Sequence, residues 1–476
     1  MLKHPILPLS PRKRSERKGV IHTAMTHSNG SKHQQMTQAP VGPLILRLAV
    51  PCIISMLVTA FYNMADTFFV GLLDSNSATG AIGVVFSLMA VIQAIGFFFG
   101  QGSGNFISRE LGKQNTEEAE NMAATGFFSS LAVGLLICIA GHIFLEPLAR
   151  FLGATPTILP YAKDYMGIIL LGAPWMTASM VLNNQLRFEG AAFYGMIGIA
   201  SGAVLNIALD PIFIFSMKMG ISGAALATVF SQFISFCLLL IGTMRSGNLR
   251  IRISRFKLKP SYYYMIFRGG LPSLARQGLA SIATICLNQA AGRYGDVAIA
   301  AMGVVQRITM FGASAMIGFG QGFQPVCGFN YGAGFYDRVK RGFWFCVKFS
   351  SLFLLLIACS GFIFAPQLIT LFRDDPAVVA FGSVALRLQC ITFCSHGWIV
   401  MSNMMMQTIG RTGPATFLSV ARQGLFFIPL VWILTVAFGI PGLQMTQAIA
   451  DLLTLFCAIP LQRKVLRQLS APEQHT

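Results

Sequence analysis

The sequence predicts an all-α polytopic membrane protein with twelve transmembrane helices in two six-helix lobes, related by a parallel pseudo-twofold repeat. Three observations lead to this fold class: long apolar runs, basic residues confined to short segments between the runs, and a second half that repeats the first. Of the 476 residues, 54% are hydrophobic and only 11% are charged. Because a soluble domain carries about 25% charged residues, this composition excludes an ordinary soluble protein.

Twelve apolar runs are long enough to cross a bilayer, which takes about 20 residues of helix. Several connectors are only a few residues long, so neighbouring helices must run antiparallel. The predicted spans are 44–71, 80–103, 122–143, 161–184, 193–215, 221–244, 266–292, 298–320, 343–364, 381–406, 415–438 and 442–462.

The net charge of +18 comes from Lys and Arg residues in short segments between the spans. This distribution predicts how the chain is oriented in the membrane and does not indicate nucleic-acid binding. With both termini inside, the inner segments hold about 23 Lys or Arg, and the outer segments hold Arg150, Lys218, Arg293 and Arg373. This bias predicts a multi-pass protein of the inner (plasma) membrane with cytoplasmic N- and C-termini. No motif in the basic segments indicates a nucleic-acid partner.

The same pattern divides the chain into five segments. Residues 1–43 are polar and basic, which is typical of a disordered cytoplasmic tail. We predict an N-lobe at 44–244, a basic cytoplasmic linker at 245–265, a C-lobe at 266–463 and a cytoplasmic tail at 464–476.

The second half repeats the first at an offset of about 220 residues. The matched features, in order, are Pro51 with Pro272, GQG at 100–102 with 320–322, Gly112 with Gly332, Pro147 with Pro366, Pro156 with Pro376, Gly190 with Gly410, and GISG at 220–223 with GIPG at 439–442. Six helices per half is an even number, so both halves enter the membrane from the same side. The repeat axis therefore runs along the membrane normal, as in transporters whose two lobes rock around a central cavity.

Ionisable residues inside spans are expensive and are functional candidates by default. In the first half these are Asp66 in the first span and Asp210 in the fifth, and Asn206 shares a helix face with Asp210. Two acids at similar depth in one lobe can share a proton or hold Na⁺. The alternative is that each acid caps a helix end at the membrane interface.

The second half lacks counterparts of these acids and carries arginines instead. Arg276, Arg307 and Arg422, together with Asp451, are candidates to line a substrate cavity. Arginines facing a cavity would favour an anionic or zwitterionic aromatic substrate. Alternatively, Asp451 holds helices together, and His396 either titrates or simply packs.

Neither a cofactor nor a metal ion is predicted, and the chain is not expected to be an enzyme. All ten Cys lie in or near apolar runs, and none forms a CxxC pair. A GxxxxGK[ST] nucleotide-binding loop is absent from the sequence, so ATP does not drive the work.

Four short motifs, taken together and in order, resemble the multidrug and toxic compound extrusion (MATE) family, in its prokaryotic DNA-damage-inducible-like branch. They are ADTFFVG at 65–71, GQG at 100–102 with SRELG at 108–112, LRFEG at 186–190, and LNIALDPIF at 205–213. The resemblance covers essentially residues 43–463.

The resemblance implies an antiporter with two lobes around a V-shaped cavity, in which inward H⁺ or Na⁺ movement drives drug efflux. It implies a cation-coupling site in the N-lobe made by Asp66, Asn206, Asp210 and Thr228. Other family members place acids on the seventh and tenth helices, which this chain lacks. That departure favours coupling through the N-lobe, and we favour H⁺ over Na⁺.

The expected partners are a small-molecule substrate, H⁺ or Na⁺, and the lipid bilayer, and we expect a monomer. The main alternative is a flippase for a lipid-linked precursor, which could share the two-lobe form. A flippase would need a cationic groove for phosphates, which the arginines of the second half could supply.

Overall fold

The structure is a computed structural model that describes residues 32–71, 76–246 and 249–470. Within these ranges the secondary structure is helical, with no strand. Eleven of the described helices are long and apolar enough to cross a membrane. A twelfth, α9, completes the predicted set: it is 33 residues long and carries Arg268 and Arg276 along its length.

The elements follow one another in two similar series. The first half contains α2 (Val41–Gly71), α3 (Asn76–Gly112), α4 (Thr116–Ile143), α5 (Leu145–Phe151), α6 (Leu159–Phe188), α7 (Ala192–Pro211), the π-helix η1 (Ile212–Ser216) and α8 (Gly220–Ser246). The short 3₁₀ helix η2 (Ile253–Arg255) lies in the connection. The second half contains α9 (Pro260–Gly292), α10 (Asp296–Gly332), α11 (Tyr336–Ile363), α12 (Ala365–Phe372), α13 (Pro376–Phe393), α14 (Ser395–Thr408), α15 (Thr412–Val420), the π-helix η3 (Ala421–Phe427), α16 (Ile428–Phe438) and α17 (Ile440–Gln468).

The internal repeat predicted from the sequence is confirmed by the lengths of matched helices. Helices α3 and α10 both have 37 residues, and α4 and α11 both have 28. The short helices α5 and α12 also occupy equivalent places in the two series. The repeat breaks at the tenth span, which is interrupted between α13 and α14, whereas its counterpart α6 is continuous. The fifth and eleventh spans both contain a π-helix, η1 and η3.

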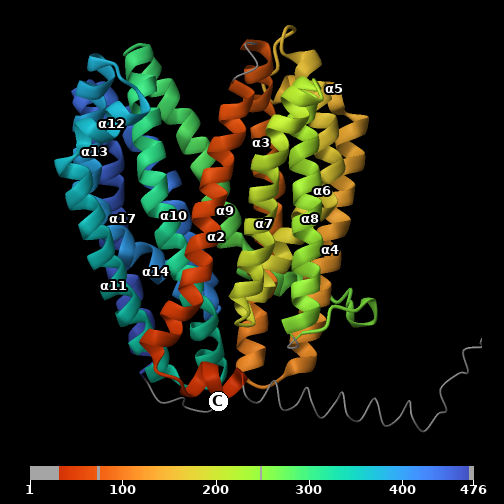
Figure 1. Ribbon diagram of the computed structural model, residues 1–476. Helices are drawn as coiled ribbons and strands as arrows, with labels where there is room; N and C mark the ends of the chain where they lie inside the picture. Colours follow the sequence, from red (N-terminus) through yellow and green to blue (C-terminus); the bar gives the residue numbers. More distant parts are fainter. Residues whose placement is uncertain (1–31, 72–75, 247–248, 471–476) are drawn as a thin grey trace, which may run out of the picture.

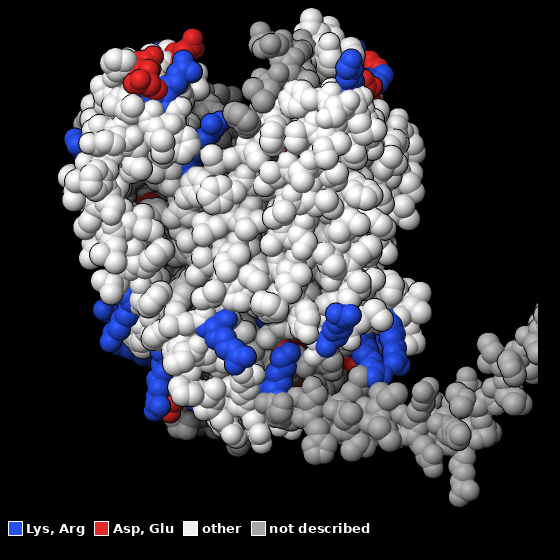
Figure 2. All heavy atoms as spheres, in the orientation of Figure 1, with Lys and Arg blue, Asp and Glu red and all other residues white. Residues whose placement is uncertain are grey.

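Figure 1 shows the two halves as separate helical bundles that converge at the end of the molecule where α17 finishes and spread apart at the opposite end. The space-filling view in Figure 2 is hollowed between the bundles at that opposite end. On the face shown, many Lys and Arg side chains lie near the end that carries the C-terminus.

The first helix of each lobe packs against the second helix of the other lobe: α2 contacts α10, and α9 contacts α3. Glycines permit this contact. A Cβ atom on Gly102 would lie 2.3 Å from the carbonyl oxygen of Ile266, and one on Gly322 would lie 2.4 Å from Cα of Ala49. Real Cβ atoms do not come so close, so the two GQG motifs bring backbones of opposite lobes into direct contact.

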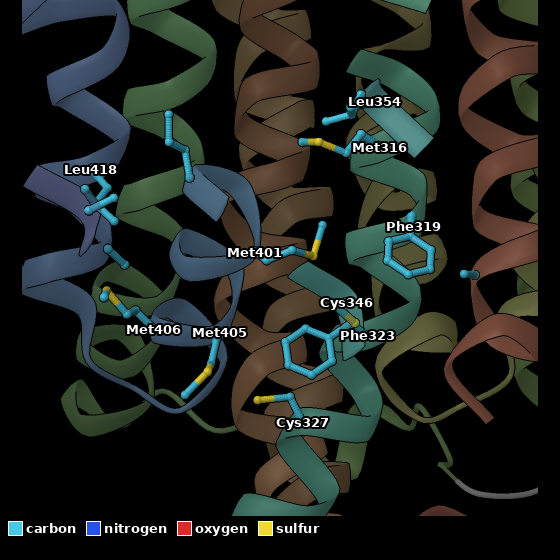
Figure 3. Packing of buried hydrophobic residues seen from close by; sticks show 14 of the residues in the cluster. Met316, Phe319, Phe323, Cys327, Cys346, Leu354, Met401, Met405, Met406 and Leu418 are labelled. Atoms are coloured by element: carbon cyan, nitrogen blue, oxygen red, sulfur yellow. The ribbon is translucent and has the colours of Figure 1, made fainter. Parts of the chain in front are cut away.

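Sulfur-containing and aromatic side chains fill much of the C-lobe core. Figure 3 shows Phe319 and Phe323 of α10 in the same buried cluster as Met401 of α14. Because Met has a flexible side chain, it fills irregular spaces between packed helices. Cys327 and Cys346 are free, buried thiols within this core.

The helix ends differ from several of the predicted boundaries. The tail predicted at 1–43 is ordered from residue 32: residues 32–38 are helical, and Met36 is buried against the turn at Gly190. Residues 1–31 lie outside the described part.

The linker predicted at 245–265 is shorter, because α8 runs to Ser246 and α9 begins at Pro260. The C-lobe and tail, predicted to divide at 463/464, are joined by α17, which runs to Gln468. Many helices therefore continue past the apolar stretch that crosses the bilayer.

Candidate functional site

A buried polar cluster joins α7 and α8 in the N-lobe. The side-chain amide of Asn206 donates to Oδ1 of Asp210 and to Oγ1 of Thr228, both at 3.3 Å. All three side chains are buried, with Asp210 and Thr228 fully so. The structure thus brings together three of the four residues that the MATE resemblance implies for the coupling site.

The local sequence explains this arrangement. Asn206 and Asp210 are four residues apart and share one face of α7. Gly198 and Gly202 on the same helix lie against Leu239 and Ser235 of α8, so the two helices approach closely. Directly after Asp210, Pro211 is followed by the π-helical turn η1. Such turns inside helices are frequent at functional sites.

Asp66, the fourth residue, lies near the end of α2, which packs against α7. Its side chain is outside the described part of the structure. The backbone therefore carries Asp66 on a helix next to the N-lobe cluster, and its participation in the site stays a prediction.

A second buried cluster lies in the C-lobe, between α14, η3 and α17. Oδ1 of Asp451 accepts hydrogen bonds from Nε of Arg422 at 2.8 Å and from the amide of Gln447 at 2.9 Å. Nε2 of His396 lies 2.8 Å from Oδ2 of Asp451 and 2.7 Å from Nη2 of Arg422. The side chains of Asp451 and His396 are buried, whereas that of Arg422 is 25% exposed.

This cluster forms one wall of a cavity of about 320 Å³ inside the C-lobe. Arg422 and Asp451, both predicted to line a substrate cavity, line this one. Arg276 and Arg307 are not among its lining residues: Arg276 is partly buried, and Arg307 is exposed. Two of the four predicted residues are therefore brought together, and the other two lie elsewhere.

Two members of the C-lobe cluster were not identified from the sequence as partners of Asp451. His396 could be noted only as a histidine that titrates or packs, and Gln447 gave no signal beyond lying four residues before Asp451. The sequence did indicate that Asp451 has a cationic partner, because it is the single acid inside the predicted C-lobe spans and a buried carboxylate needs a cation nearby. The sequence does not show which of several arginines provides it.

A further buried charge, Glu189, lies outside the spans, in the turn between α6 and α7. Burial raises the pKa of its carboxyl to about 7, although the nearby Lys32 ammonium and a hydrogen bond from Ser246 act in the opposite direction. The equivalent position in the C-lobe, next to Gly410, is Ile409, which is also buried. An acid thus occupies in one lobe the place of an apolar residue in the other.

No group of three or more His, Cys, Asp or Glu side chains that could hold a metal ion occurs in the described ranges. Each cluster consists of a few polar groups surrounded by apolar packing.

Comparisons with known proteins agree with this architecture. The sequence model of the MatE family matches residues 51–212 and 272–433, one match in each lobe. The chain is 27% identical over 418 residues to the multidrug export protein MepA of Staphylococcus haemolyticus, covering 87% of this chain and 92% of that protein. It is 26% identical over 428 residues to MepA of Staphylococcus aureus, covering 89% and 93%.

Two solved structures superpose on the chain with a TM-score of 0.86 and 27% identity, covering 92% of this chain and 98% of theirs. One is described as the outward-facing conformation of a multidrug resistance MATE family transporter of the MOP superfamily. The other is a MOP superfamily transporter from Pyrococcus furiosus, whose description reports reverse polarity of the binding pocket.

Proposed function

Because the chain belongs to the multidrug and toxic compound extrusion family of membrane transporters, we propose that it is a secondary active antiporter driven by inward H⁺ movement through the N-lobe cluster. It exports small organic molecules across the bacterial plasma membrane, with both termini in the cytoplasm. The observation that carries the proposal is the fully buried carboxyl group of Asp210, hydrogen-bonded by Asn206, which also bonds Thr228.

A buried carboxylate requires a compensating charge, and a proton or Na⁺ can supply it. Asp210 directly precedes Pro211 and the π-helical turn η1, where the backbone departs from regular helix. Loading the cation removes the buried negative charge and so changes the packing that α7 and α8 prefer. Asp66, on the adjacent α2, is the second acid of the proposed site.

Na⁺ is the alternative coupling ion. Hard cations prefer oxygen ligands, and the cluster offers the oxygens of Asp210, Thr228 and Asn206. Within the described residues, Oδ1 of Asn206 has no hydrogen-bond partner. We favour H⁺ because a carboxyl group buried among apolar helices can be neutralised by one proton without assembling a full coordination shell.

The two-lobe repeat supports alternating access as the transport mechanism. The glycine contacts between α3 and α9 and between α2 and α10 join the lobes near the C-terminal end, while the surface is hollowed at the other end. Rocking of one lobe against the other about these contacts would expose the cavity to each side in turn.

Efflux from proteoliposomes tests the proposal, with ethidium as a cationic probe and either a pH gradient or a Na⁺ gradient imposed. We expect a pH gradient to drive efflux in the wild type and both Asp66→Asn and Asp210→Asn to abolish it. Asp164→Asn is the matched control, because Asp164 is exposed near the start of α6. Normal gradient-driven efflux in both site variants would refute coupling through the N-lobe, and efflux driven by Na⁺ alone would identify the other ion.

A further inference from the structure

His396 occupies a position in the C-lobe cluster where its Nε2 atom faces two groups with opposite requirements. Nε2 lies 2.8 Å from the carboxylate oxygen Oδ2 of Asp451 and 2.7 Å from Nη2 of Arg422. The carboxylate only accepts hydrogen bonds and the guanidinium only donates. One ring nitrogen cannot donate to the first and accept from the second, so only one of the two contacts is a hydrogen bond at any time.

The two alternatives differ in what they do to Arg422. When Nε2 carries no proton, it accepts from Arg422 and holds the guanidinium against the wall. When Nε2 takes up a proton while Nδ1 keeps its own, the resulting imidazolium donates from Nε2 to Asp451, and this N–H opposes Nη2 of Arg422. Arg422 then keeps its Nε bond to Asp451 at 2.8 Å, and its terminal nitrogens turn toward the cavity.

The backbone around the cluster can accommodate such a change. His396 is in the first turn of α14, directly after the interruption of the tenth span at Cys394. Arg422 is the second residue of the π-helix η3. Interrupted helices and π-helical turns inside a membrane commonly mark ligand sites.

The rest of the cavity wall is uncharged. Its apolar side chains include Met302 of α10, Phe393 of α13 and Phe427 of η3. The amides of Gln306 and Gln389 provide neutral polar groups from α10 and α13. Among the lining residues, those from α9, α10 and α13 include no charged or titratable side chain.

Charged residues do occur on those same helices, but they are not part of this wall. Arg268 and Arg276 are on α9, Asp296 and Arg307 are on α10, and Arg387 is on α13. Arg387 donates to the carbonyl oxygen of Phe362. The cluster of Asp451, Arg422 and His396 therefore sets the electrostatics of the cavity. Its net charge is zero when His396 is neutral and +1 when the imidazole is protonated.

We propose that this C-lobe cavity binds an aromatic carboxylate through Arg422, and that each bound carboxylate is accompanied by one proton taken up by His396. The carboxylate pairs with the terminal nitrogens of Arg422, a geometry that guanidinium groups favour. The protonated imidazole of His396 then donates to Asp451, in the place that the terminal nitrogens of Arg422 leave. The positive charge of the imidazolium balances the negative charge of the bound carboxylate, so the cavity gains no net charge. The aromatic body of the ligand packs on the apolar wall.

This inference names a substrate class for the transporter proposed above and in that sense rests on it. The binding site itself is separate from the N-lobe cluster and does not depend on coupling through Asp210. Binding measured without any gradient therefore distinguishes the two proposals.

Calorimetric titration of the purified protein in lipid nanodiscs tests the site, with 2-naphthoate as the probe and the neutral, similarly shaped 2-naphthamide as its control. At about pH 7.5, above the ordinary pKa of imidazole, titrations in two buffers with different ionisation enthalpies report the protons taken up. We expect about one proton per naphthoate and none per naphthamide, since one imidazole titrates. His396→Gln should abolish the uptake. Naphthoate binding without proton uptake in the wild type would overturn the role of His396.

Removing Arg422 alone would leave Asp451 buried without its cation, so the informative variant is the double change Arg422→Gln with Asp451→Asn, which stays neutral. We expect this variant to weaken naphthoate binding by about tenfold or more and to leave naphthamide binding unchanged, because the charge-assisted bonds are lost. Arg387→Gln, an arginine change outside the cavity, should bind both probes like the wild type. Equal naphthoate affinity in the double variant would overturn the site.

Asp210→Asn separates the two proposals. It should bind naphthoate normally while losing gradient-driven ethidium efflux. If it kept efflux, coupling through the N-lobe would fail while the carboxylate site stood. If the wild type did not prefer naphthoate to naphthamide, the carboxylate site would fail while N-lobe coupling stood.

Discussion

The two lobes place a buried polar cluster between equivalent helices and fill it with different chemistry. In the N-lobe the cluster joins α7 to α8, and the carboxyl of Asp210 is hydrogen-bonded by the neutral amide of Asn206. In the C-lobe it joins η3 and α14 to α17, and the carboxylate of Asp451 contacts a guanidinium and an imidazole.

The difference shows how a duplicated scaffold can divide its tasks. Loading a cation onto the carboxyl of Asp210, to which the neutral amide of Asn206 donates, changes the net charge of the N-lobe cluster, which is what a coupling site requires. A carboxylate in an ion pair is already compensated, and it positions its partner beside a cavity. We infer that the repeat supplies a common frame while the buried charges assign the lobes different roles.

The largest expected effect comes from breaking the C-lobe ion pair. Asp451→Asn leaves the guanidinium of Arg422 without its carboxylate, and we expect it to lower the free energy of unfolding by about 3 kcal/mol. Asp210→Asn removes a buried charge and keeps the contact with Asn206, so its free energy of unfolding should stay close to that of the wild type. Denaturant unfolding in detergent micelles, followed by far-UV circular dichroism, measures both.

Restoring neutrality is the control for that experiment. The double variant Arg422→Gln with Asp451→Asn should recover most of the stability lost in Asp451→Asn, because no unpaired charge remains. If Asp210→Asn and Asp451→Asn destabilised the protein equally, the two carboxyls would have the same structural role, and the contrast between lobes would be wrong.

The sequence was sufficient for the fold because the relevant signals are repeated many times. Apolar length predicts each span, and the order of matched glycines and prolines predicts the repeat. Asn206 and Asp210 were also predictable as neighbours, since they lie four residues apart on one helix.

The C-lobe cluster was only partly predictable, because its members are far apart in the sequence. Asp451 is separated by 29 residues from Arg422 and by 55 from His396. Several other arginines lie in the same half, and only packing selects one of them. Likewise, the burial of Met36 depends on the turn at Gly190, more than a hundred residues away, so the predicted tail extended too far.

Glu189 provides a second contrast between lobes, with an intermediate effect on stability. Because burial raises the pKa of its carboxyl to about 7 from an ordinary value of 4.5, the folded protein retains a proton that the unfolded chain releases between these values. Stability contributed by the protonated form is therefore lost as the pH rises from 4.5 to 7, by at most about 1.4 kcal/mol per pH unit. We expect Glu189→Gln to flatten this dependence.

Thermal unfolding at a series of pH values across that window checks the prediction. Asp164→Asn, which changes an exposed acid of the same lobe, should keep the slope of the wild type. An unchanged slope in Glu189→Gln would assign the pH dependence to another group.

The smallest expected effect concerns Thr228, which tests how finely the N-lobe cluster is tuned. Thr228→Val keeps the shape of the side chain and removes the oxygen that accepts from Asn206 at 3.3 Å. Losing one such hydrogen bond costs about 1 kcal/mol. If the amide of Asn206 then turns fully toward Asp210, it favours the ionised carboxylate, and the midpoint of the efflux pH profile should move to lower pH by somewhat less than about one unit.

Thr454→Val in α17 is the matched control, because that buried hydroxyl donates to Ala450 of its own helix. A shift of the same size in both variants would mean that the profile reports general packing. A shift confined to Thr228→Val would place the titrating group beside Asn206, in the lobe where that neutral amide donates to the carboxyl of Asp210.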